Sequence, residues 1–174
     1  FGYSIFMSIN QDILTGLKEA MIAERTGIEF YQAAAEKTVD PQGKEVFLRL
    51  ADEERRHLEY LRRQFENVFN NSGFEPLTDK SKIDLEGASP IFSEEIKGRL
   101  KTAHWEMSAL SVGLALEQAS ISRYQELAKR AEKPDAKEFF LALVRWEQTH
   151  LAALQKQFNY LREFYWEQAG FAPF

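Results

Sequence analysis

Residues 47–61 read FLRLADEERRHLEYL and residues 140–154 read FLALVRWEQTHLAAL, so the same apolar spacing and the same Glu-x-x-His motif recur 93 residues later. The similarity extends to both sides of these segments. Between residues 24 and 65, 17 of 42 positions are identical to the positions 93 residues further on, without a gap. The sequence therefore contains an internal duplication. Two copies are too few for a solenoid and favour one domain with pseudo-twofold symmetry.

Each copy of the repeat predicts a pair of α-helices. Asp40 followed by Pro41 is typical of an N-cap with proline at the first helical position, and Lys133-Pro134 marks the matching break in the second copy. The spacing of apolar residues predicts helices at about residues 10–37, 41–69, 107–131 and 134–165. The short turns make each pair an antiparallel hairpin.

A longer segment joins the two hairpins. Residues 70–92 favour a connector over a helix, since they contain Asn70-Asn71-Ser72-Gly73, Pro76, Gly87 and Pro90, and residues 93–100 could add a short helix. A connector of this length can run along a bundle, so the second and third helices could be parallel. No segment has the alternating pattern of a strand. The sequence predicts an all-α four-helix bundle that forms a single domain over residues 1–174.

Acidic residues and histidines interrupt the core-facing stripes of these helices. Spacings of three and four place each of them in line with large apolar residues on one helix face. They are Glu24, Glu54, His57, Glu117, Glu147 and His150. An isolated buried carboxylate costs several kcal/mol, and four close together also repel one another. No lysine or arginine lies on the same stripes, so two divalent cations would balance the four negative charges.

The spacing within each Glu-x-x-His motif suits a metal ligand pair. A Glu and a His three residues apart project side by side, about one helical turn in separation, and can bind one ion from one helix. Each metal would then take one histidine, while carboxylates bridge the ions or complete their shells. A carboxylate-rich site with two histidines favours iron or manganese over a closed tetrahedral zinc site. We predict two iron ions, for which manganese or zinc could substitute.

One Glu on each of two helices and Glu-x-x-His on the other two resembles the ligand set of ferritin-like di-iron carboxylate proteins. The segments Glu24-Arg-Thr-Gly-Ile-Glu-Phe-Tyr31 and Ala51-Asp-Glu-Glu-Arg-Arg-His57 look like the rubrerythrin branch, and the resemblance covers about residues 10–165. It implies a ferritin-like fold and a non-haem di-iron oxidoreductase. The implied substrates are hydrogen peroxide or dioxygen, the electrons come from an external donor, and the assembly is a homodimer.

Two features depart from the rubrerythrin pattern. Rubrerythrins usually carry a rubredoxin-like domain with paired Cys-x-x-Cys motifs, whereas these 174 residues contain no cysteine. Rubrerythrins also tend to have a further glutamate one turn after the third-helix ligand. This chain has Ser120 there, and Gly27 at the repeat-related position. The sequence therefore looks more like the minimal rubrerythrin-type proteins that lack the rubredoxin domain.

Other residues near the motifs have more than one interpretation. Tyr31 and Tyr124, two turns after the first glutamate of each copy, could donate a hydrogen bond to a ligand carboxylate or could simply pack in the core. Trp146 is interpreted as a packing aromatic. Glu53 could be solvated or could support the ligands. His104 lies outside the repeat and is predicted to be a surface or connector histidine.

Composition narrows the classes of function. The chain has 22 Lys plus Arg and 27 Asp plus Glu, a net charge of -5, which argues against nucleic-acid binding. Without cysteine there is no disulfide framework, thiolate metal site or cysteine nucleophile. The uncharged runs are much shorter than the roughly 18 residues that span a bilayer, and no signal-peptide pattern is seen. We therefore expect a cytoplasmic protein without a membrane span.

Three functions are compatible with these observations. The first is a di-iron oxidoreductase acting on hydrogen peroxide or dioxygen. The second is an iron-binding or ferroxidase protein that handles or delivers iron without a dedicated small-molecule substrate. The third is a bundle in which the metals only stabilise the fold. The sequence favours the first.

Overall fold

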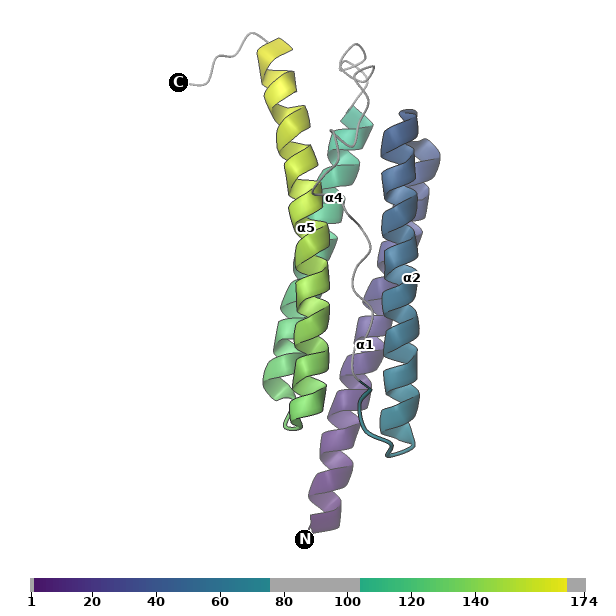
Figure 1. Ribbon diagram of the computed structural model, residues 1–174, viewed down its shortest axis with the longest axis vertical. Coiled ribbons are helices and arrows are strands. Elements are labelled where there is room, and N and C mark those ends of the chain that lie inside the picture. Colours follow the sequence, from purple (N-terminus) through teal and green to yellow (C-terminus); the bar gives the residue numbers. More distant parts are fainter. Residues whose placement is uncertain (1, 76–103, 169–174) are drawn as a thin grey trace.

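Four α-helices make up the described part of the computed structural model, residues 2–75 and 104–168, and this part contains no strand (Figure 1). The helices are α1 (Gly2–Lys37), α2 (Pro41–Phe69), α4 (His104–Arg130) and α5 (Pro134–Gln168). The prediction of an all-α four-helix bundle is confirmed. The predicted connector after residue 75 and the short helix at 93–100 lie outside the described residues. None of the described helices combines the length and the apolar character needed to cross a membrane.

The turns between paired helices lie where the sequence predicts them. Asp40 caps α2, because its Oδ2 accepts a hydrogen bond from the backbone nitrogen of Gly43 at 2.8 Å. Pro41 is the first helical residue, where its missing N–H and fixed φ cost nothing. Pro134 occupies the same position at the start of α5.

The outer helix ends differ from the prediction. α1 begins at Gly2 rather than near residue 10, since residues 3–9 contain neither proline nor glycine. α4 begins at His104 rather than 107, and α5 continues to Gln168 rather than 165, again through residues without a helix breaker.

Two antiparallel hairpins, α1 with α2 and α4 with α5, lie side by side, and α1 packs against α4 (Figure 1). α2 and α4 run in the same direction, as the length of the connector allows. The start of the connector is attached to α2. Gln64 Nε2 donates to the carbonyl of Glu75 at 3.0 Å, and the amide of Glu75 donates to Gln64 Oε1 at 2.9 Å.

The apolar core has two clusters that the repeat relates to each other. One contains Tyr31, Phe47, Leu50, Leu110 and Leu154. The other contains their counterparts Tyr124, Phe140, Leu143, Leu17 and Leu61. Each of these ten side chains is at most 1% exposed. Because the repeat relates the residues of one cluster to those of the other, the pseudo-twofold axis passes between the two clusters. The buried glutamates and histidines lie in this region.

Candidate metal centre

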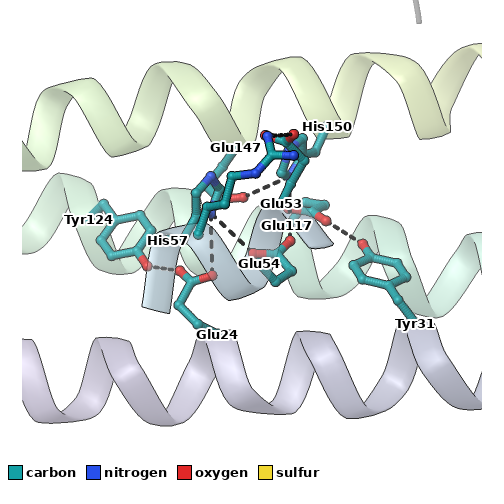
Figure 2. A network of polar contacts seen from close by, with 10 residues as sticks. Glu24, Tyr31, Glu53, Glu54, His57, Glu117, Tyr124, Glu147 and His150 are labelled. Carbon is teal, nitrogen blue, oxygen red and sulfur yellow. Dashed lines mark hydrogen bonds and ion pairs between the residues drawn. The ribbon is translucent and has the colours of Figure 1, made fainter. Parts of the chain in front are cut away.

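All six residues predicted to bind metal come together in one layer of the bundle (Figure 2). Each helix contributes to it: α1 one glutamate, α4 one glutamate, and α2 and α5 one Glu-x-x-His motif each. The most exposed of the six, Glu54, is only 4% exposed, and both histidines are completely buried. Apolar clusters on both sides of the layer keep water away from these ionisable groups.

Each histidine points its Nδ1 atom at three carboxylates from three helices. His57 Nδ1 lies 3.1 Å from Glu54 Oε2, 3.1 Å from Glu147 Oε1 and 3.4 Å from Glu24 Oε2. The two imidazole rings are stacked, with centroids 5.3 Å apart and an interplanar angle of 12°. Both nitrogens therefore face the same small space between the carboxylates.

The second histidine repeats this arrangement. His150 Nδ1 lies 3.3 Å from Glu147 Oε2, 3.4 Å from Glu54 Oε1 and 3.6 Å from Glu117 Oε2. Two groups of potential ligands result, with ligand atoms within 4.8 Å of one another: Glu24, Glu54, His57 and Glu147 in one, and Glu54, Glu117, Glu147 and His150 in the other. The groups overlap, because Glu54 and Glu147 belong to both. The layer therefore has two positions for a cation and two carboxylates that could bridge them.

Two buried tyrosines hold the outer carboxylates from opposite ends (Figure 2). The hydroxyl of Tyr31 donates to Glu117 Oε1, and the hydroxyl of Tyr124 donates to Glu24 Oε1. Each tyrosine thus contacts the glutamate of the opposite hairpin. Little room is left beside this contact, because a Cβ atom on Gly113 would lie 3.2 Å from Leu154 Cδ1 and 3.4 Å from the Tyr31 hydroxyl oxygen. Of the two roles open at the sequence level, the structure shows the hydrogen bond to a carboxylate.

Burial shifts the two outer glutamates, Glu24 and Glu117, which each belong to one group only, toward the protonated form. Burial, followed by the charges of Glu54 and Glu147, raises the pKa of Glu24 and of Glu117 well above 4.5. Burial and the charge of Glu117 also raise the pKa of Tyr31, which keeps that hydroxyl a hydrogen-bond donor.

The pKa values of the shared glutamates, Glu54 and Glu147, and of both histidines shift in the direction opposite to the one that burial alone would produce. Burial favours neutral Glu54, but hydrogen bonds with Glu24, His150 and His57 outweigh it and hold the pKa of Glu54 well below 4.5. The pKa of Glu147 is also lowered, by the two histidines against the effects of burial and of Glu54. Burial favours the neutral histidines too, but the surrounding carboxylates raise the pKa of both well above 6.5. Without metal, these directions favour ionised Glu54 and Glu147 beside protonated His57 and His150.

The donor atoms of this layer fit a pair of metal ions. Both carboxylate oxygens of Glu147, both ring nitrogens of His150 and Nε2 of His57 are buried, and none makes a hydrogen bond of good geometry beyond the histidine–carboxylate contacts described above. A buried polar group without its full set of partners costs about 1–3 kcal/mol. Oxygen and imidazole nitrogen are also the ligands that iron and manganese take in carboxylate sites. Cations between these atoms would satisfy them and would replace the protons of the outer glutamates and histidines.

A family comparison agrees with this geometry. The family model named Rubrerythrin matches residues 16–158, which is most of the chain. The chain belongs to the rubrerythrin family. Comparisons with curated proteins and with solved structures found no match. Residues 16–158 of this rubrerythrin include the six potential ligands and both tyrosines.

A cavity of about 290 Å³ leads from the surface of this rubrerythrin to the carboxylate layer, between α1 and α4. Its buried end is formed by Glu24, Gly27, Glu54 and Glu117. Ile22, which is 67% exposed, lies at its outer end, where Arg123 Nη1 also lies 3.4 Å from Glu19 Oε2. Ser120, which stands where rubrerythrins tend to have a further glutamate, and its repeat counterpart Gly27 both line the cavity. Their small side chains leave this side of the site open.

The sequence left the role of Glu53 undecided, and in this rubrerythrin Glu53 is buried. Its side chain is 4% exposed, forms an ion pair with Arg56, and has a ligand-type oxygen within 4.8 Å of ring nitrogens of His57 and His150. The signal that could have identified Glu53 was its repeat counterpart Trp146, since an aromatic residue marks a covered position. His104 is exposed, as predicted.

Proposed function

We propose that this rubrerythrin is a non-haem di-iron oxidoreductase that reduces hydrogen peroxide or dioxygen. The observation that supports the proposal most strongly is the pair of overlapping four-residue groups that share Glu54 and Glu147. Overlapping groups would hold two cations close together, which suits the reduction of an O–O bond by two electrons at one site. The family match supports iron as the metal. Manganese or zinc could occupy the same donor set.

In this proposal, Glu24, Glu54, His57 and Glu147 would hold one ion and Glu54, Glu117, Glu147 and His150 the other, so that Glu54 and Glu147 belong to both groups. Two iron ions held there would supply the two electrons that convert hydrogen peroxide and two protons into two water molecules. Tyr31 and Tyr124 fix the orientation of Glu117 and Glu24 by donating hydrogen bonds to them. The leucine and phenylalanine side chains of the two apolar clusters cover the reacting groups from above and below, while the cavity side stays open.

The oxidant reaches the layer through the cavity between α1 and α4. This side is lined by carboxylates and small residues, whereas the imidazole rings of both histidines lie on the side of α2 and α5. An external donor returns the electrons after each reaction. The homodimer and the cytoplasmic location inferred from the sequence stay predictions.

Anaerobic loading with Fe(II), followed by mixing with hydrogen peroxide or with dioxygen in a stopped-flow spectrometer, tests the proposal. We expect the bound iron to be oxidised faster than free Fe(II) in the same buffer. The control is the double variant Glu24→Ala/Glu117→Ala, which removes one carboxylate from each position and should react like free iron. If neither oxidant accelerates the oxidation of bound iron, the proposed function is wrong. Oxidation by dioxygen followed by release of Fe(III) would instead support the iron-handling function.

A further inference from the structure

The cavity between α1 and α4 is larger than hydrogen peroxide or dioxygen needs. Its volume is about 290 Å³. One water molecule occupies about 30 Å³ in the liquid, and hydrogen peroxide has only one further oxygen atom. Even with two cations at its inner end, the cavity keeps room for a group of carbon atoms. Clefts that bind organic ligands in proteins begin at about this size, roughly 300 Å³. The volume therefore indicates a substrate with an organic part.

Small and apolar side chains form most of the cavity wall outside the carboxylates. Ile22, Ala23 and Thr26 contribute to it from α1, and Leu116 and Ala119 contribute from α4. Ile22 and Ala119 are exposed, whereas Ala23 and Leu116 are half-buried, so the apolar wall continues from the surface inward. Such a wall favours apolar atoms, because each methylene group that leaves water for it stabilises the complex.

The charges of the cavity lining favour an uncharged molecule. Besides the glutamates of the metal centre, the lining contains two charged side chains, and these form an ion pair in which Arg123 Nη1 lies 3.4 Å from Glu19 Oε2. At the inner end lie the carboxylates of Glu24, Glu54 and Glu117. Two divalent cations would balance the four ligand carboxylates and would leave no net positive charge to attract an anion. The lining therefore favours a neutral substrate over a carboxylate or a phosphate.

At its inner end the cavity reaches the potential ligands directly. Glu24, Glu54 and Glu117 all line it. Gly27 lies beside them, and a Cβ atom on this residue would lie 3.3 Å from Glu54 Cγ. Ser120, at the repeat-related position, also has a small side chain. A molecule in the cavity can therefore place one end against the carboxylate layer while its apolar part stays between α1 and α4.

A hydroperoxide with an organic substituent meets these requirements, because it joins an uncharged O–O group to an apolar part. We propose that small, uncharged organic hydroperoxides are the peroxide substrates of this rubrerythrin, an inference that rests on the proposed di-iron function. The O–O bond breaks when it accepts the two electrons of the ferrous centre. The oxygen attached to carbon takes one proton and leaves as an alcohol, while the other oxygen takes one proton and leaves as water. Solvent supplies both protons.

Cumene hydroperoxide and hydrogen peroxide test the inference as a pair, since both contain an O–O bond but only the first has an apolar part. Each is mixed anaerobically with Fe(II)-loaded protein in a stopped-flow spectrometer, and free Fe(II) in the same buffer gives the intrinsic ratio of the two rate constants. We expect the protein to raise this ratio in favour of cumene hydroperoxide by about tenfold or more. The rate with cumene hydroperoxide should also saturate with its concentration, because the substrate binds before it reacts.

Ala119→Phe and Ala115→Phe are a matched pair of variants on α4, since both alanines are exposed but only Ala119 lines the cavity. A phenylalanine at the outer end of the cavity should obstruct an organic substituent more than it obstructs hydrogen peroxide. We expect Ala119→Phe to slow the reaction with cumene hydroperoxide by about tenfold more than the reaction with hydrogen peroxide. Ala115→Phe should react with both peroxides like the wild type. Iron content and melting temperature serve as checks on each variant.

A second readout measures binding without turnover. Cumyl alcohol, the product expected from cumene hydroperoxide, is titrated into Zn(II)-loaded protein, and binding is followed by nuclear magnetic resonance. We expect saturable binding to the wild type and to Ala115→Phe, and binding weaker by about tenfold or more in Ala119→Phe. This measurement depends on the cavity and not on the redox state of a metal.

The outcomes separate the substrate class from the proposed function. If hydrogen peroxide oxidises bound Fe(II) faster than free Fe(II) but the protein does not favour cumene hydroperoxide, the inference is wrong and the oxidoreductase proposal stands. Equal effects of Ala119→Phe on both peroxides, or no binding of cumyl alcohol to the wild type, would also overturn the inference. If neither peroxide oxidises bound Fe(II) faster than free Fe(II), peroxide reduction fails as the proposed function, and the inference fails with it.

Discussion

Glu54 and Glu147 differ from the other four potential ligands because they belong to both groups. Substitution of a shared glutamate should therefore disturb two metal positions, and substitution of an outer glutamate only one. We expect Glu24→Ala to lower the metal content from the two positions of the wild type to about one, and Glu54→Ala to lower affinity at both positions. Anaerobic titration with Co(II), followed by isothermal calorimetry and metal analysis, measures this difference.

A suitable control for these variants is Glu19→Ala, since the Glu19 side chain is 57% exposed and lies outside both groups. It should bind metal like the wild type. Retention of one tightly bound ion by Glu54→Ala would contradict the assignment of Glu54 as a bridging ligand. Equal losses in Glu24→Ala and Glu54→Ala would contradict it as well.

The residues of the layer could be predicted from the sequence because each one replaces an apolar residue in a helical stripe. The same reasoning could not settle Glu53, which is adjacent to Glu54 but lies among charged neighbours. Periodicity reports which face of a helix a residue occupies. It does not report whether a neighbouring helix covers the edge of that face, and α5 covers Glu53 here.

α1 and α4 form the open side of the site because small residues face each other between them. Ser120→Leu should fill part of the cavity and slow the reaction of bound Fe(II) with peroxide by about tenfold or more, without lowering metal content. Stopped-flow oxidation and metal analysis measure the two effects. Ser120 is the better choice than Gly27, because a Cβ atom at position 27 would lie 3.3 Å from Glu54 Cγ and could displace a ligand.

Ser122→Leu is the matched control on the same helix, since Ser122 is exposed and does not line the cavity. It should react like the wild type. An unchanged oxidation rate in Ser120→Leu would show that the oxidant reaches the site by another path. A loss of metal in Ser120→Leu would show that the substitution acts on the ligands instead.

The helices themselves were predictable to different degrees. The inner ends, at the turns after α1 and α4, follow from Pro41 and Pro134, because proline imposes a local conformation whatever surrounds it. The outer ends carry no such residue. There the backbone stays helical beyond the predicted bounds, and sequence patterns alone do not define where it stops.

Protons and metal ions compete for the same buried carboxylates and imidazoles, and this competition affects the stability of the whole bundle. In metal-free protein, the pKa values of Glu24, Glu117, His57 and His150 are raised. A raised pKa stabilises the folded state fully below the unfolded pKa, and this contribution is lost as pH rises through the folded pKa. We therefore expect the melting temperature of metal-free protein to be lower at a pH above these raised pKa values than at about pH 6.

The lowered pKa values of Glu54 and Glu147 do not alter this expectation, because their contribution is lost only as pH falls below 4.5. Bound metal replaces the protons, so the loaded protein should not lose stability over the same interval, and metal affinity should increase with pH. Differential scanning calorimetry of chelator-treated and Co(II)-loaded protein at both pH values measures the effect. A metal-free melting temperature that rises with pH would contradict it.

The sequence by itself determined the duplication, the four helices and the six residues that interrupt the apolar stripes, because spacing along a helix fixes which side chains share a face. Only the tertiary structure decided how these faces meet. It placed Glu54 and Glu147 in both groups, directed each tyrosine to the glutamate of the opposite hairpin, and stacked Trp146 on His57. Such contacts join atoms from different helices, so they depend on the rotation and crossing of the helices, which no local spacing encodes.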